Sequence, residues 1–169
     1  SFDTSGALSQ IVSNTLVANI AEYLSNYRMI NDYVSVETAE VIDLAVDVSI
    51  VLDASQNQGQ IIGKVINLIA EYFNPSTREL GQNVNIPELT SSIQLQDGVI
   101  TVTDMKFFNR VGGEYSSSVT SMNYVNNSTR EIEPTDSTLF ALPNQIYQIR
   151  YPNKDITVRV KNFQTVTIS

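Results

Sequence analysis

Histidine and cysteine are both absent from this chain of 169 residues. Without them the common zinc, copper and non-haem iron sites lose their usual ligands. A nucleophilic triad with a histidine base is excluded, as are disulfide bonds and thiol nucleophiles. Only carboxylate, lysine or tyrosine chemistry remains for catalysis. We therefore expect a protein that is not an enzyme and that has neither a metal nor another cofactor.

Positive charge is also scarce, with 10 lysines and arginines against 18 aspartates and glutamates and a net charge of −8. Such a field repels phosphate backbones, so we expect no nucleic-acid partner. Apolar runs are short and interrupted, so we expect no membrane partner either. Residues 1–5 contain no methionine and no basic leader. We interpret this start as a cut or processed end of a longer protein.

Apolar residues at spacings of three and four predict a helix over residues 6–29. Its other face is polar but nearly uncharged. Such a face suits a contact with another subunit, and we expect a homodimer because closed symmetric contacts are the usual mode of homo-oligomers. The candidate self-association residues on this helix are Asn14, Leu16, Asn19, Tyr23 and Tyr27.

Strict alternation over residues 40–53 predicts a long, half-buried strand of an antiparallel sheet. A broad apolar stripe over residues 57–73 predicts a helix that covers the apolar face of this strand. Pro87 then opens a short helix to about Leu95. The Asp97–Gly98 turn leads into a strand over residues 99–108. The expected fold class is α+β, with a split β-α-β core sheet covered by helices.

The composition becomes polar after Asn109, and we expect loops with short strands around Val119 and Tyr124. Alternation over residues 145–151 and 155–163 predicts a terminal hairpin that turns through Pro152, Asn153 and Lys154. We therefore expect a helix-plus-core domain over residues 1–109 and a β-rich extension over residues 110–169.

Acidic pairs are the first candidates for chemistry. Asp43 and Asp47 share a strand face, but four residues of strand separate them by roughly 13 Å. That distance is too long for one metal ion or a carboxylate dyad, so we interpret them, together with Asp53, as solvent-facing charges. Glu131 and Glu133 are about 6.6 Å apart in an extended segment, a spacing near that of glycoside hydrolases. They adjoin a loop, which favours a solvated acidic patch.

A faint phosphate-loop pattern spans residues 59–65, but it fails in detail. Only three residues separate Gly59 from Gly63, and Val65 stands where serine or threonine is required. The glycines also fall inside the predicted helix rather than before it. We expect no nucleotide site here.

A series of motifs resembles the J-like baseplate proteins of tailed phages. In chain order these are Tyr27–Val36 before the long strand, Glu71–Pro75 at the end of the helix, Leu80–Gln82, Ile86–Leu89, and Asp97–Val102 at the start of the last strand. Each motif is degenerate, and their order carries the resemblance, which covers about half of the chain at the level of pattern.

The resemblance implies a structural role without catalytic residues. Such proteins build a ring around the tail tube, associate with a second copy and with other baseplate wedge proteins, and rearrange when the tail contracts. It also implies a location in the virion after assembly in the host cytoplasm. Two alternatives remain open from the residues. One is a receptor- or glycan-binding module that uses Tyr115 or Tyr124 in the polar loops. The other is a carboxylate hydrolase that uses Glu131 and Glu133.

Overall fold

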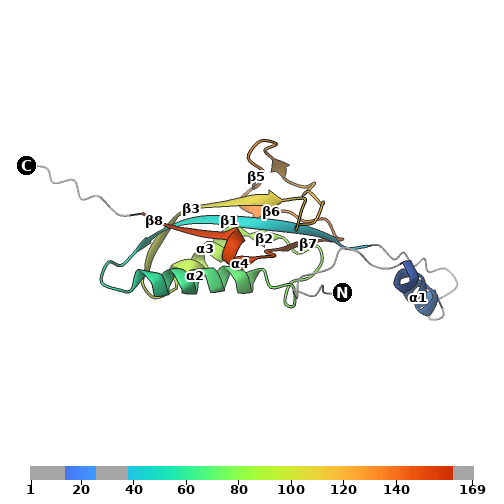
Figure 1. The fold of residues 1–169 in the computed structure, drawn as a ribbon, viewed down its shortest axis with the longest axis horizontal. Coiled ribbons are helices and arrows are strands. Elements are labelled where there is room, and N and C mark those ends of the chain that lie inside the picture. Colours follow the sequence, from blue (N-terminus) through green and yellow to red (C-terminus); the bar gives the residue numbers. More distant parts are fainter. Residues whose placement is uncertain (1–13, 26–37, 162–169) are drawn as a thin grey trace, which may run out of the picture.

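The computed structural model describes residues 14–25 and 38–161, which form a mixed α+β fold (Figure 1). The helices in these ranges are α1 (Asn14–Ser25), α2 (Gln58–Tyr72), α3 (Ile86–Gln94) and α4 (Pro152–Asp155). The strands are β1 (Glu40–Leu52), β2 (Val84–Asn85), β3 (Val99–Arg110), β4 (Tyr124–Val125), β5 (Glu131–Glu133), β6 (Thr138–Leu139), β7 (Gln145–Gln148) and β8 (Ile156–Val160).

The long strand β1 is the centre of the main sheet. On one side it pairs with β3 in antiparallel register, and β5 and β4 continue the sheet beyond β3. On its other side β1 pairs with two strands in succession. β7 runs parallel to residues 40–43 of β1, and β8 runs parallel to residues 46–50. The short strands β2 and β6 form a separate pair.

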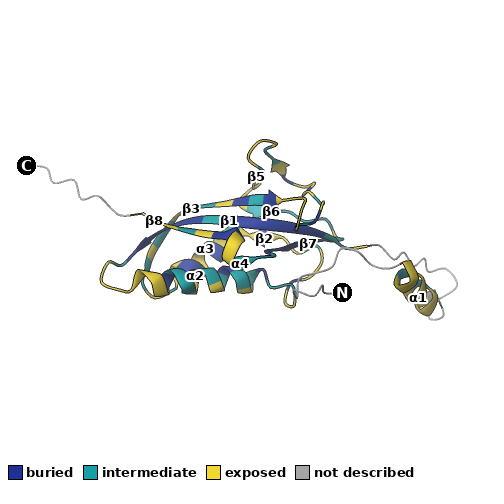
Figure 2. Ribbon diagram, viewed as in Figure 1, coloured by how far each residue is buried: buried dark blue, intermediate teal, exposed yellow. Residues whose placement is uncertain are grey.

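Helices α2 and α3 cover one face of the main sheet (Figure 1). Each begins where the sequence supplies a cap: the side chains of Asn57 and Asn85 accept hydrogen bonds from the first turns of α2 and α3. The core is formed by alternate residues of β1 and the apolar stripes of the helices. β1 is buried along most of its length, on both faces, so the prediction of a half-buried strand is wrong (Figure 2). The largest fully buried members of the core include Ile42, Leu44, Ile50, Ile69, Phe73, Leu89, Ile93, Phe107 and Tyr147. The predicted helical cover of the strand is confirmed.

The predicted terminal hairpin is wrong. β7 and β8 do not pair with each other, because both run parallel to β1 along the same edge. The segment between them forms the short helix α4, opened by Pro152, instead of a reversing turn. Two strands that continue in one direction show the same alternation as two strands of a hairpin, so the pattern alone does not distinguish them.

The predicted split β-α-β core is also wrong. That arrangement places a further strand between two parallel strands, whereas β1 and β3 are direct antiparallel neighbours. The helices α2 and α3 lie between them in the chain. Because the chain reverses direction from each element to the next, two intervening helices leave β3 antiparallel to β1. The predicted antiparallel character of the sheet is correct for β3 and incorrect for β7 and β8, so the sheet is mixed.

The remaining expectations are met in part. Helix α1 covers residues 14–25 of the predicted range 6–29, and the rest of that range lies outside the described residues. A strand is present at Tyr124, and none at Val119. The main sheet takes strands from both sides of position 109. In the described ranges, no helix is both long enough and apolar enough to cross a membrane.

Candidate functional site

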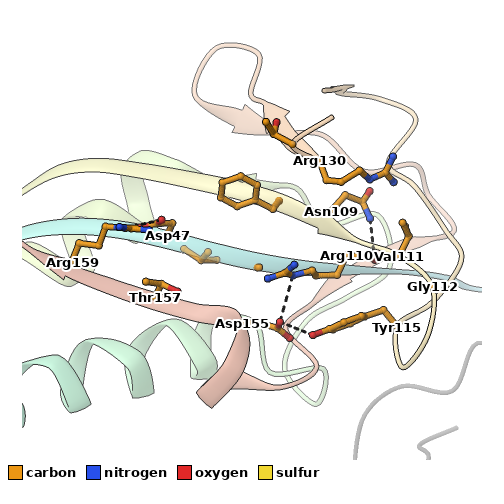
Figure 3. A pocket seen from close by; sticks show the side chains of 14 residues that line it. Asp47, Asn109, Arg110, Val111, Gly112, Tyr115, Arg130, Asp155, Thr157 and Arg159 are labelled. Carbon is orange, nitrogen blue, oxygen red and sulfur yellow. Dashed lines mark hydrogen bonds and ion pairs between the residues drawn. The ribbon is translucent and has the colours of Figure 1, made fainter. Parts of the chain in front are cut away.

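A cavity of about 520 Å³ lies on the face of the sheet that α2 and α3 leave uncovered (Figure 3). Ala45 and Asp47 of β1 alternate with the core residues and point to this face. Their cross-strand neighbours contribute to it as well: Phe108 of β3 pairs with Ala45, and Thr157 of β8 pairs with Asp47. The walls come from the last residues of β3, from the loop that follows it and from the turn at residues 129–130. The lining residues of this end of β3 and its loop are Asn109, Arg110, Val111, Gly112 and Tyr115.

Two ion pairs lie among the residues that line the cavity. The Arg159 Nε lies 2.9 Å from both carboxylate oxygens of Asp47, and the Arg159 side chain is 65% exposed. The Arg110 Nε lies 3.6 Å from Oδ1 of Asp155, a carboxylate that is fully buried. Arg110 is half-exposed, so its guanidinium borders both the cavity and the solvent.

Asp155 fixes the loop after β3 to helix α4. The Tyr115 hydroxyl donates a hydrogen bond of 2.7 Å to Asp155 Oδ1, and the Tyr151 backbone N–H donates one of 3.3 Å to Oδ2. The rings of Tyr115 and Tyr151 meet edge to face at 5.7 Å, and the Lys154 ammonium lies 5.4 Å from the Tyr115 ring centroid. Burial, followed by the hydrogen bond to Asp155, raises the pKa of Tyr115.

Arg130 has two unusual features in one residue. Its backbone has a φ of +64°, the left-handed region that glycine and asparagine favour. Its Nε and Nη2 atoms are buried and have no hydrogen-bond partner. The backbone conformation costs about 1–3 kcal/mol, and each buried unpaired donor costs about as much again. No sequence pattern marks Arg130, because its only signal is a large residue where a turn prefers glycine.

Asp43 was predicted to face solvent, and this prediction is wrong. It is fully buried. Its Oδ2 accepts a hydrogen bond of 2.7 Å from the Ser116 backbone N–H, and its Oδ1 accepts one of 2.7 Å from Gln148 Nε2. The Arg150 Nε lies 3.4 Å from Oδ2. The alternation of the strand correctly placed Asp43 on the face away from the helices. The loop around Ser116 covers this end of the face, which the alternation does not reveal.

The other acidic candidates remain separate. Asp47 is partly exposed and paired with Arg159. Asp53 follows β1 and accepts hydrogen bonds from the backbone N–H and the hydroxyl of Ser55, which lower its pKa. Over the described residues, no group of three or more acidic side chains is arranged to hold a metal ion.

Glu131 lies on β5 and pairs with Lys106 at 3.3 Å, while Glu133 is exposed on the same short strand. This placement fits the interpretation as a solvated acidic patch. The residues of the failed phosphate-loop pattern, Gly59 to Val65, lie within helix α2. Of the two tyrosines considered for glycan binding, Tyr124 is 63% exposed and Tyr115 is held by Asp155.

The candidate self-association residues within the described ranges all lie on α1. Asn14 and Asn19 are exposed, Leu16 is 44% exposed and Tyr23 is 63% exposed. Tyr27, the fifth candidate, lies outside the described residues. The structure therefore places four of the five on α1, and none of these four lines the cavity.

Comparisons with known proteins give no family for this chain. No family model matches its sequence, and no curated protein matches it significantly.

Proposed function

We propose that this chain is a structural subunit of a contractile phage tail baseplate, and specifically the C-terminal part of a wedge protein. In this role it self-associates as a homodimer through α1 and contacts other wedge proteins in the ring around the tail tube. The ring rearranges during contraction. This proposal needs neither catalysis nor a cofactor.

The observation that carries the proposal is the exposed apolar stripe of α1. Leu16, Ile20, Tyr23 and Leu24 recur at helical spacing and are 44%, 38%, 63% and 38% exposed. Burying this stripe against a second copy would remove apolar surface from water, which favours association. Glu22 is the one charged residue of α1, so a two-fold contact brings few like charges together.

The order of elements gives further support. Each motif of the resemblance that lies in the described residues falls on the element type it requires. The Tyr72–Phe73 pair ends helix α2, Pro87 lies in the first turn of α3, and Gly98 precedes strand β3. These placements agree with the pattern of the J-like baseplate proteins, in which a strand, a helix, a short helix and a strand follow one another.

Light scattering after size exclusion tests the self-contact. We expect a mass near twice 18.7 kDa for the wild-type chain. Ile20→Glu should give a monomer, because it places a charge in the stripe. Ile100→Glu is the matched control, since Ile100 is 57% exposed on β3 and lies outside α1. Charged substitutions at Asn14 and Asn19 should weaken the dimer too. A wild-type monomer at high concentration, or a dimer that survives Ile20→Glu, contradicts the contact.

A further inference from the structure

The exposed apolar side chains of the described residues fall mainly on two segments. Eleven large hydrophobic residues in the described ranges are exposed, and eight of them lie either on α1 or between residues 111 and 124. Exposed apolar groups that gather on one part of a folded chain usually mark an interaction site. We name the surface formed by Val119, Met122 and Tyr124 the loop patch. The four residues on α1 are Leu16, Ile20, Tyr23 and Leu24, and the four on the second segment are Val111, Val119, Met122 and Tyr124.

The segment that carries the loop patch is polar on its buried side and apolar on its exposed side. Its buried members include Thr120 and Asn123, whereas Met122 between them is 49% exposed. The Thr120 backbone N–H donates a hydrogen bond of 2.9 Å to Oδ1 of Asn109 on β3. The Asn123 Nδ2 donates one of 2.9 Å to the Phe140 carbonyl oxygen. These buried bonds anchor the segment, and a surface that is already ordered loses less conformational entropy on binding.

The loop patch and α1 match each other in charge as well as in apolar character. Residues 115–129 contain no charged side chain, and Glu22 is the one charged residue of α1. The whole chain has a net charge of −8, so contacts through its more acidic surfaces bring like charges together when two copies meet. The centres of protein interfaces are depleted in charge and enriched in tyrosine and methionine, which Tyr124 and Met122 supply. These two weakly charged surfaces can therefore be buried against each other at a low electrostatic cost.

The loop patch lies beside the point at which the chain from α1 enters the sheet. β1 begins at Glu40, and the Gln145 Nε2 donates a hydrogen bond of 2.8 Å to Oε2 of Glu40. The same Nε2 atom donates one of 3.5 Å to Oγ of Ser121, which lies between Val119 and Met122 in the sequence. A two-fold axis near this point places the α1 of each copy within reach of the loop patch of the other. Reciprocal exchange of a chain segment between two copies requires this arrangement.

We propose that α1 of one copy buries its apolar stripe on the loop patch of a second copy, and that the second copy does the same in return. This inference rests on the proposed function, because it names the surface that α1 meets in the homodimer. In the single chain neither surface covers the other, since Ile20 and Leu24 are each 38% exposed and Met122 is 49% exposed. Apolar anchors four residues apart on one helix, such as Ile20 and Leu24, are a usual means by which a helix docks on a partner.

Cysteine crosslinking tests this contact without background, because the chain contains no cysteine of its own. Ile20→Cys and Met122→Cys chains with different tags are purified separately, mixed to equilibrium and treated with bismaleimidoethane, which joins two thiols. We expect a product that carries both tags and has a mass near twice 18.7 kDa. In the control mixture Leu95→Cys replaces Met122→Cys. Leu95 is 85% exposed but lies outside the loop patch, so this mixture should not give the product.

Charged substitutions measure how much the loop patch contributes to the dimer. Met122→Asp and Tyr124→Asp each place a carboxylate in the buried contact, so we expect either one to raise the dimer dissociation constant by about tenfold or more. Leu95→Asp is the control and should leave this constant unchanged. Sedimentation equilibrium measures the three constants, and circular dichroism checks that each variant is folded.

Three results would overturn the proposal. The first is a crosslink between two Ile20→Cys chains with none to Met122→Cys, which would show that α1 meets α1. The second is a crosslink within one chain of the double variant Ile20→Cys/Met122→Cys and none between chains, which would show that α1 docks on its own loop patch. The third is a dimer whose dissociation constant neither Met122→Asp nor Tyr124→Asp changes. In the first and third cases the homodimer of the proposed function still stands, whereas a wild-type monomer contradicts both proposals, so the two failures are distinguishable.

Discussion

Gln148 donates a hydrogen bond of 2.7 Å from its Nε2 to Oδ1 of Asp43, across 105 positions of sequence. The two residues are register partners in the parallel pairing of β7 with β1. Both side chains are buried, and the same carboxylate accepts from the backbone of Ser116. One aspartate therefore joins the central strand, an edge strand and the loop after β3.

Removing this carboxylate should destabilise the fold strongly. Asp43→Ala removes the carboxylate that accepts hydrogen bonds from the Ser116 N–H and the Gln148 amide and that lies 3.4 Å from the Arg150 Nε. We expect the free energy of unfolding to fall by about 3–5 kcal/mol, the usual effect of breaking a buried charged pair from one side. Urea denaturation measures the change.

Asp47→Ala is the matched control, because Asp47 lies on the same strand and the same face. Its partner Arg159 is 65% exposed, so the pair contributes only about 0.2–1 kcal/mol. Equal losses in the two variants would show that Asp43 has no special role in joining the segments.

The helices and strands that were predicted correctly are those whose sequence signals lie within the element or directly beside it. β1, α2, α3 and β3 were all predicted, because alternation, helical spacing, caps and a glycine turn mark them. The direction of β7 and β8 was not predicted, since their partner in β1 lies about 100 residues earlier in the chain.

The candidate site shows the same limit. Alternation identified the face on which Asp43 and Asp47 lie, but which of them a loop would cover depends on tertiary contacts to Ser116 and Gln148. The cavity brings together side chains from β1, the end of β3, the turn before β5, and β8. No local motif connects these segments, so the cavity, with Arg110, Arg130 and Arg159 in its lining, could not be predicted from the sequence.

Two glycines should respond in opposite ways to alanine. Gly98 has a φ of +91°, and a Cβ there would lie 2.4 Å from Cδ1 of Ile61 and 2.8 Å from Oε1 of Gln56. Gly98→Ala should therefore lower the free energy of unfolding by about 1–3 kcal/mol. Gly63 lies inside α2 with open space around its Cα, so Gly63→Ala should raise it by about 0.5–1 kcal/mol. Thermal denaturation of both variants measures the free energy of unfolding. A change of the same sign in both variants would contradict the prediction.

Phe73 is the aromatic residue that joins α2 to the sheet. It is 1% exposed, its ring meets those of Tyr72 at 5.1 Å and Phe107 at 6.4 Å, and the Arg78 guanidinium lies 5.3 Å from its centroid. Phe73→Ala should lower the free energy of unfolding by about 3–5 kcal/mol, because it removes buried area and leaves a cavity. Leu95, which is 85% exposed, is the control: Leu95→Ala should change the same quantity by less than about 0.5 kcal/mol. A loss below about 1 kcal/mol for Phe73→Ala would show that the core relaxes into the space.

Tyr147 should make the fold sensitive to alkaline pH. It is fully buried, and its hydroxyl lies 2.6 Å from the Phe140 carbonyl oxygen. The same hydroxyl is hydrogen-bonded to the side chains of Asn123 and Thr120. Burial raises the pKa of this hydroxyl above its ordinary value of 10.0. Above about pH 10 the unfolded chain therefore binds fewer protons than the folded chain, and the free energy of unfolding falls as pH rises.

The size of this effect follows from proton linkage. One tyrosine that stays protonated in the folded chain lowers the free energy of unfolding by up to about 1.4 kcal/mol per pH unit, from the unfolded pKa up to the folded pKa. Tyr147→Phe should make the decline above pH 10 shallower. Some decline should persist, because the pKa of Tyr115 is raised as well. Tyr124→Phe is the control, since Tyr124 is 63% exposed and should leave the slope unchanged. Urea denaturation at several pH values between neutrality and the alkaline range measures the slopes, and an equally steep decline in Tyr147→Phe and the wild type would rule out Tyr147 as the source.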